Sequence, residues 1–235
     1  MAIFIPMTKM PERIALSHSF GGLAAALVGV SEYSRYAGAL EAGKMAAVGF
    51  EVMLGAVTFT GSLMAFGKLQ GVIAERPLTH RFQNVLNITL FVVTIAAIVY
   101  LIPNTTQQAL FYGVLGMSFL LGILIVLPIG GADMPVVIAL LNSYAGLAAA
   151  ATGFALSNSV LIVCGALDGA SGFFLSIVMS KAMNRSFSNI LFGAFGRESE
   201  NSNGTARSVR KSLLGATIGD AKQTLAELIR VVKEQ

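Results

Sequence analysis

Six long apolar stretches separate the charged residues of this chain, and they constrain its fold more than any other feature. Each approaches the ~20 residues that an α-helix needs to cross a bilayer. Only 12% of the residues are charged, whereas a soluble domain carries about 25%. Backbone groups in lipid must be satisfied internally, and the stretches lack the alternation of barrel strands. We therefore predict an all-α, polytopic transmembrane bundle of about six spans, at roughly residues 13–33, 45–66, 84–102, 108–128, 134–156 and 159–180.

Lysine and arginine flank the predicted spans unequally. With six spans, both termini, the 67–83 loop and the 129–133 turn share one side. That side carries Lys9, Arg13, Lys68, Arg76, Arg81, Lys181 and Arg185, and the other side only Arg35 and Lys44. The positive-inside rule then predicts that both termini are cytoplasmic, in a bacterial inner membrane or its equivalent. Because the basic residues flank spans, the net charge of +4 indicates a lipid bilayer and not nucleic acid.

The sequence changes character after the last span. We predict a transmembrane domain over 1–196, a polar linker over 197–215 and a C-terminal helix over 216–235. Asp220 is a plausible N-cap of this helix. One amphipathic face then collects the apolar residues Ala221, Leu225, Leu228, Ile229 and Val232.

Small residues recur at four-residue spacing within the spans, and Cys164 also lies in an apolar stretch. We expect both features to serve packing, because small residues let helix backbones approach closely in lipid. The recurring sets are Gly21/Ala25/Gly29, Gly146/Ala150 and Gly165/Gly169.

Five polar residues fall within or at the start of predicted spans, where ionisable groups are costly and are functional candidates. They are His18, Glu51, Asp133, Asn142 and Asp168. An imidazole has an unperturbed pKa of about 6.5, so His18 could bind and release a proton at cellular pH. Asn142 comes nine residues after Asp133, which places it ~13–14 Å deeper in the membrane.

Structural explanations stay open for all five residues, and His18 is the strongest functional candidate among them. Asn142 and Asp168 could hydrogen-bond a neighbouring helix, and Asp133 could cap the start of its helix. Glu51 could face the membrane interface. Taken together, the five residues indicate a proton path.

Familiar catalytic motifs are missing from the sequence. It contains no Walker motif, no G-x-G-x-x-G, no metal-ligand cluster and no serine triad. Any catalytic chemistry is therefore expected in another domain or chain.

Several ordered blocks resemble the membrane domain of the proton-translocating NAD(P) transhydrogenase beta subunit. One block runs from Gly130-Gly131-Ala132-Asp133-Met134-Pro135 to Leu141-Asn142-Ser143-Tyr144-Ala145-Gly146. Another is Lys181-Ala182-Met183-Asn184-Arg185-Ser186-Phe187. Further blocks are Met7-Thr8-Lys9-Met10-Pro11-Glu12 with His18-Ser19-Phe20, and Thr58-Phe59-Thr60-Gly61-Ser62 with Ala65-Phe66-Gly67-Lys68-Leu69. The resemblance covers roughly residues 7–196 and is highly specific as a set.

The resemblance implies a function and a set of residues. Transhydrogenases exchange hydride between NAD(H) and NADP(H) in soluble domains and couple this exchange to proton passage through the membrane domain. In the family, residues at the places of His18 and Asn142 are linked to the proton path. Residues at the places of Asp133, Ser62, Lys181 and Arg185 are associated with coupling to the NADP domain. Our predicted proton pathway comprises His18, Asn142, Ser62, Glu51 and Asp168, and our predicted coupling residues are Asp133, Lys181 and Arg185.

The resemblance also implies partners. Family members have additional spans before the histidine-bearing helix and an NADP-binding domain of more than a hundred residues after the last one. Here Gly219-Asp220-Ala221-Lys222 and the following residues resemble only the last helix of that domain. We therefore expect the chain alone to bind no nucleotide or metal and to catalyse no hydride transfer. The expected partners are an alpha subunit or NAD-binding domain, an NADP-binding domain, the remaining helices, and a second copy in a dimer of the complete enzyme.

Two other functions stay open at this stage. A non-enzymatic proton or ion channel would leak protons through vesicles that contain this chain alone. A structural assembly remnant would show no leak, and deleting it would prevent its partners from assembling.

Overall fold

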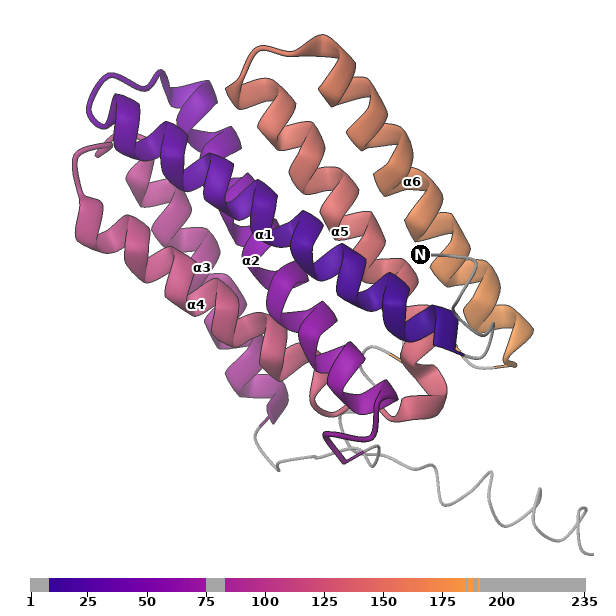
Figure 1. The fold of residues 1–235 in the computed structure, drawn as a ribbon. Coiled ribbons are helices and arrows are strands. Elements are labelled where there is room, and N and C mark those ends of the chain that lie inside the picture. The colour runs from indigo at the N-terminus through magenta and orange to yellow at the C-terminus, as the bar shows by residue number, and fades with distance from the viewer. Residues whose placement is uncertain (1–8, 75–82, 185, 188–189, 191–235) are drawn as a thin grey trace, which may run out of the picture. The chain divides into compact units, whose positions relative to one another are not determined.

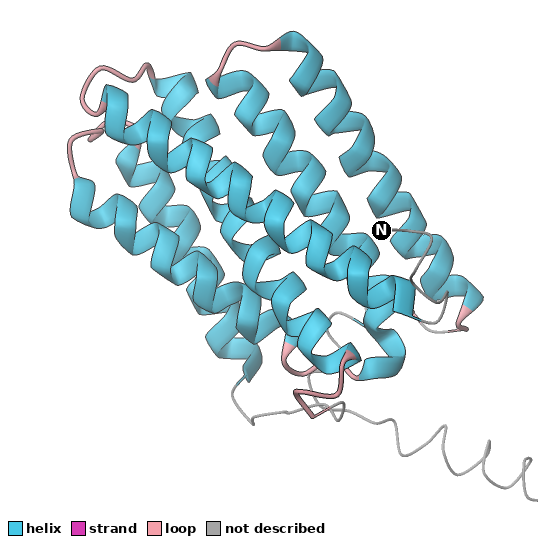
Figure 2. Ribbon diagram, in the orientation of Figure 1, coloured by secondary structure: helices cyan, strands magenta, loops and turns pink. Residues whose placement is uncertain are grey.

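The computed structural model describes residues 9–74, 83–184, 186, 187 and 190. All of them belong to Met1–Gly196, the first of two units into which the chain divides. The described residues form helices, turns and loops and contain no strand (Figure 2). The long helices are α1 (Met10–Tyr36), α2 (Ala42–Leu69), α3 (Gln83–Leu101), α4 (Gln108–Val126), α5 (Met134–Ala155) and α6 (Ser159–Ala182), with a short 3₁₀ turn, η3 (Gly131–Asp133), before α5.

The helix bounds confirm the predicted all-α transmembrane bundle. Five of the long helices, all except α3, are long and apolar enough to cross a membrane. The apolar part of α3, Val85–Leu101, is shorter. Pro11 lies in the first turn of α1, where a residue without an N–H group costs the helix no hydrogen bond. The predicted linker and C-terminal helix lie outside the described residues.

Successive helices alternate in direction, so the bundle has two ends (Figure 1). We call the end where α1 begins the near end, and it also holds the end of α2, the α4–α5 connection and the end of α6. The opposite end, the far end, holds the connections 37–41, 102–107 and 156–158.

Helices α2 and α5 lie at the centre of the bundle. Two thirds of the most apolar part of each is buried, against 22% for α6. Helix α2 packs against α1, α3, α4 and α5, while α6 packs chiefly against α5. The buried polar residues of α2 are therefore held inside protein, where other helices can satisfy them.

Glycines allow the closest helix contacts. A Cβ atom added to Gly146 on α5 would lie 2.3 Å from the backbone nitrogen of Gly169 on α6. One added to Gly165 would lie 2.4 Å from the nitrogen of Ala150. The packing role predicted for these sets is confirmed. In α1 the prediction is right for Gly29, which meets α2, and wrong for Gly21, which faces open space while its neighbour Gly22 meets α2.

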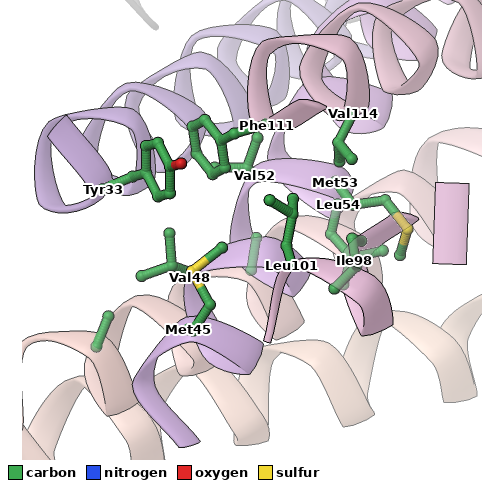
Figure 3. Packing of buried hydrophobic residues seen from close by; sticks show 12 residues of the cluster. Tyr33, Met45, Val48, Val52, Met53, Leu54, Ile98, Leu101, Phe111 and Val114 are labelled. Carbon is green, nitrogen blue, oxygen red and sulfur yellow. The ribbon is translucent and has the colours of Figure 1, made fainter. Parts of the chain in front are cut away.

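Two apolar clusters fill the bundle, one towards each end. Figure 3 shows the far-end cluster, in which Tyr33 of α1 stacks on Phe111 of α4 with ring centroids 3.8 Å apart. The Tyr33 hydroxyl also donates a hydrogen bond of 2.8 Å to the carbonyl oxygen of Thr105. The near-end cluster includes Ala15, Ala65 and Ile129. Tyr33 thus ties α1 to the α3–α4 connection.

Candidate functional site

A cavity of about 230 Å³ at the near end contains two of the predicted pathway residues. His18 and Asn142 both line it, although they are far apart in the sequence. Helices α1, α5 and α6 supply its walls, through Pro11, Ile14, His18, Pro135, Ile138, Ala139, Asn142, Leu175 and Met179. We call this space the near cavity.

His18 lies about two turns into α1 and is half-buried. Its Nδ1 atom is buried without a hydrogen-bond partner among the described residues. The Asp168 carboxylate on α6 lies within electrostatic range of the ring. This histidine therefore has a buried ring nitrogen that no described residue pairs and a negative group nearby.

Asn142 joins α5 to α6. Its side-chain nitrogen donates a hydrogen bond of 3.3 Å to Oδ1 of Asp168. The interhelical hydrogen bond that the sequence left open for both residues is therefore present. Asp168 itself is exposed. This bond brings a carboxylate to the edge of the near cavity without burying it.

Glu51 is fully buried among the helices, so its side chain does not face outward from the bundle. Its Oε1 atom accepts a hydrogen bond of 2.7 Å from the Thr152 hydroxyl on α5. Its Oε2 atom has no hydrogen-bond partner among the described residues. A Cβ atom added to Gly29 would lie 3.3 Å from the Glu51 carboxyl carbon, so the glycine leaves room for this side chain.

Ser62 lies opposite His18 in the antiparallel register of α1 and α2. Gly29 meets Glu51, and Gly22 meets Thr58, whose Cβ would be 2.9 Å from an added Cβ atom. Four residues earlier on α1 and four residues later on α2, the same register pairs His18 with Ser62. Ser62 is buried, and its hydroxyl has no partner among the described residues.

The predicted coupling residues lie at the near end or outside the described residues. Asp133 ends η3 and is buried, with 8% of its surface exposed. It occupies the position before α5, but its side chain makes no capping hydrogen bond to that helix. Lys181 is exposed in the last turn of α6. Arg185 lies outside the described residues.

Lys68 departs from the sequence prediction, which placed it in a loop flanking the membrane. It lies instead in the last turn of α2 and is fully buried. Its ammonium group donates to the carbonyl oxygens of Val126 at 3.3 Å, Ile129 at 2.7 Å and Leu127. These carbonyls end α4, where the helix dipole favours a cation. Lys68 therefore holds the connection that leads to Asp133.

A second cavity, of about 370 Å³, lies at the far end. We call it the far cavity. Residues of α1, α2, α5 and their connections line it, namely Glu32, Tyr36, Ala39, Leu40, Glu41, Lys44, Ala155 and Leu156. Sequence reasoning missed both Glu32 and Thr152. Glu32 is a carboxylate within the last turns of α1 and could have been noticed, whereas a threonine in an apolar span carries no distinctive signal.

Together, the helical bundle and its buried titratable groups define an integral membrane protein. Residues 1–233 match the family model described as NAD(P) transhydrogenase beta subunit. The chain belongs to this family, so the resemblance found in the sequence motifs is confirmed.

Curated relatives agree with this assignment. The NAD(P) transhydrogenase subunit beta of Rhodospirillum rubrum is 42% identical over 199 residues, which are 82% of this chain and 43% of that protein. A protein of the same name from a named strain of that species gives the same values. The chain thus spans less than half the length of these relatives.

Proposed function

We propose that this chain is the proton-translocating membrane part of a transhydrogenase that couples hydride transfer between NAD(H) and NADP(H) to proton movement. The observation that carries the proposal is the near cavity, which His18 and Asn142 line from different helices. The imidazole takes up a proton from one side of the membrane and releases it to the other. Asn142 and Asp168 position polar groups beside it, and Ser62 and Glu51 extend the pathway along α2.

The coupling half of the proposal concerns the near end. Lys181 and Arg185 belong to the surface on which a nucleotide domain docks, and the buried Asp133 takes part in the coupling from within the near end. The protonation state of His18 alters how that domain holds NADP(H). By linkage, nucleotide binding changes the proton affinity of the site by the same free energy. NAD(H) and NADP(H) belong to the nucleotide domains of the complete enzyme, since this sequence has no dinucleotide fingerprint.

The complete enzyme contains further parts in this proposal. They are an alpha subunit or NAD-binding domain, an NADP-binding domain, the remaining helices and a second copy. The near end, which carries most of the basic residues, faces the cytoplasm. The double variant Lys181→Cys, Cys164→Ser should react with an impermeant thiol reagent only from the cytoplasmic side. Reaction from the opposite side only would reverse the orientation.

The central experiment replaces His18 with asparagine in the complete complex, reconstituted in vesicles. Removing the titrating group should lower the rate of proton uptake coupled to hydride exchange by about a hundredfold, the scale of general acid–base catalysis. The matched control is His80→Asn, since His80 is the other histidine and falls between the second and third predicted spans. Proton uptake by the His18 variant at the rate of the His80 variant would contradict the proposal.

A further inference from the structure

The interface between α1 and α2 contains a row of buried polar atoms without hydrogen-bond partners among the described residues. They belong to His18 and Ser19 on α1 and to Glu51, Thr58 and Ser62 on α2. Buried polar groups in folded proteins are normally paired with protein atoms or ordered water. Five such atoms along one interface are groups that ordered water or a transient proton carrier could pair.

The atoms of the row follow one register along both helices. Thr58 and Ser62 are four residues apart on α2, and Glu51 is two turns before Thr58, so all three share one side of the helix. Ser19 lies on the side of α1 that packs into the bundle, with Gly22 one turn later. Since Gly22 meets Thr58, the hydroxyls of Ser19, Thr58 and Ser62 fall in one layer beside His18.

Glu51 lies one turn from the far cavity. Gly29 of α1 leaves room for the Glu51 side chain, and Glu32, three residues further along α1, lines that cavity. On α5, Thr152 binds Glu51, and Ala155, again three residues on, lines the same cavity. Three residues of helix rise by ~4.5 Å, so the buried carboxylate and the cavity are separated by about one helical turn. The Glu32 carboxylate is also within electrostatic range of Glu51.

A close backbone contact separates Thr58 from Glu51. A Cβ atom added to Gly55 would lie 2.8 Å both from the nitrogen of Ala26 and from the carbonyl oxygen of Gly22. Helices this close leave no room for water between them. The row therefore has two halves, one that includes His18 and one that includes Glu51, with a closed contact between them.

We propose that the proton route continues along the α1–α2 interface from the near cavity to the far cavity, through Thr58, Glu51 and Glu32. We call this part the far half of the route. This inference rests on the proposed function and adds the exit at the far end. Each hydroxyl accepts a proton on its oxygen as it gives its own to the next group. The Glu51 carboxylate takes up one proton to become a carboxylic acid and then passes it to Glu32 and the water of the far cavity. The Gly22–Gly55 contact keeps the two halves apart and must open for a proton to pass, which prevents a passive leak.

Glutamine variants of the two carboxylates test the route in the complete complex, reconstituted in vesicles. Glu51→Gln retains an acceptor for Thr152 but cannot carry a proton, so proton uptake should fall by about tenfold or more. Glu32→Gln should lower it by about threefold to tenfold, because water in the cavity can partly replace this carboxylate. The matched control is Glu12→Gln, at the other end of α1, where the side chain binds Gln70.

Two further measurements separate proton transfer from structural damage. Thr58→Val removes the hydroxyl at nearly constant volume, and Thr58→Ser restores it, so only the valine variant should slow proton uptake. If Glu51→Gln prevents the complex from assembling, the two Thr58 variants alone test whether protons pass along the α1–α2 interface. In infrared difference spectra after a pH jump, Glu51→Gln should remove a protonated-carboxyl band that Glu12→Gln retains.

The outcomes distinguish this inference from the proposed function. If His18→Asn blocks proton uptake while the Glu51, Glu32 and Thr58 variants match Glu12→Gln, the far half of the route is wrong, and so is the place of Glu51 in the pathway. Proton translocation through His18, the core of the proposed function, then stands. If His18→Asn also leaves proton uptake unchanged, the proposed function fails.

Discussion

Each end of this bundle contains a cavity and a secured helix connection, but different side chains form them. The near cavity has mainly apolar walls and a single titratable group, His18, whereas Glu32, Glu41 and Lys44 line the larger far cavity. Each end also secures a connection between helices through backbone carbonyls. At the near end Lys68 does this with a buried charge, and at the far end Tyr33 does it with one hydroxyl and a stacked ring.

From this difference between Lys68 and Tyr33 we infer that the near end is held more rigidly than the far end. Removing the buried ammonium group takes a charged donor away from three carbonyls, of which, among the described residues, only that of Val126 also accepts a backbone hydrogen bond, from the Ile129 N–H group. A tyrosine that loses its hydroxyl still keeps its stacking contact. The connection that the near end holds so firmly leads directly to Asp133, the predicted coupling residue.

The largest expected effect concerns the near-end lysine. Lys68→Met should lower the free energy of unfolding by about 3 kcal/mol, because buried carbonyls lose charged donors. The same substitution at Lys44, an exposed residue near the other end of α2, should change stability by less than about 0.5 kcal/mol. Thermal unfolding of the purified complex measures both. If the two variants had equal melting temperatures, Lys68 would not stabilise the near end, and the proposed difference in rigidity between the two ends would be wrong.

A smaller effect is expected from filling the cavities. Ile14→Trp narrows the near cavity beside His18, and we expect proton uptake by the complete complex to fall by about tenfold. Leu40→Trp in the larger far cavity leaves more room for water, and the loss should be about threefold. Initial rates of proton uptake in vesicles measure the loss for each variant, and the two losses are then compared. A larger loss for Leu40→Trp would make the far end the narrower part of the route.

The smallest effect concerns the far-end tyrosine. Tyr33→Phe removes the hydrogen bond to Thr105 and keeps the ring on Phe111, so the cost should be about 1 kcal/mol. Tyr112→Phe is the control, because Tyr112 is exposed on α4. Chemical unfolding followed by circular dichroism would compare them. A cost for Tyr33→Phe as large as that for Lys68→Met would mean that both ends are held equally firmly.

The helices could be predicted closely because their cause is local. Each predicted span lies within a few residues of an observed helix, since a backbone in lipid must bond to itself. Glu51 could be identified as a polar residue in a span, but its partner Thr152 could not. The two are 101 residues apart, and their contact depends on how α2 and α5 are rotated against each other.

For Lys68 the sequence-based prediction itself was wrong. A basic residue near the end of an apolar stretch normally reaches the interface, so its sequence position indicated exposure. The carbonyls that surround it come from the end of α4 and the residues after it. Only the packing of α4 beside the end of α2 turns this lysine inward.

By itself, the sequence determined that this chain is a bundle of transmembrane helices with a histidine, an asparagine and carboxylates at membrane depth. Helical hydrogen bonds join residues four apart, so composition and length are sufficient for that conclusion. The tertiary structure decided which polar groups share a cavity, which carboxylate is buried and which glycine meets a neighbour. A shift of one residue, as between Gly21 and Gly22, turns a side chain about 100° around its helix. Such rotations are set only when all the helices pack together.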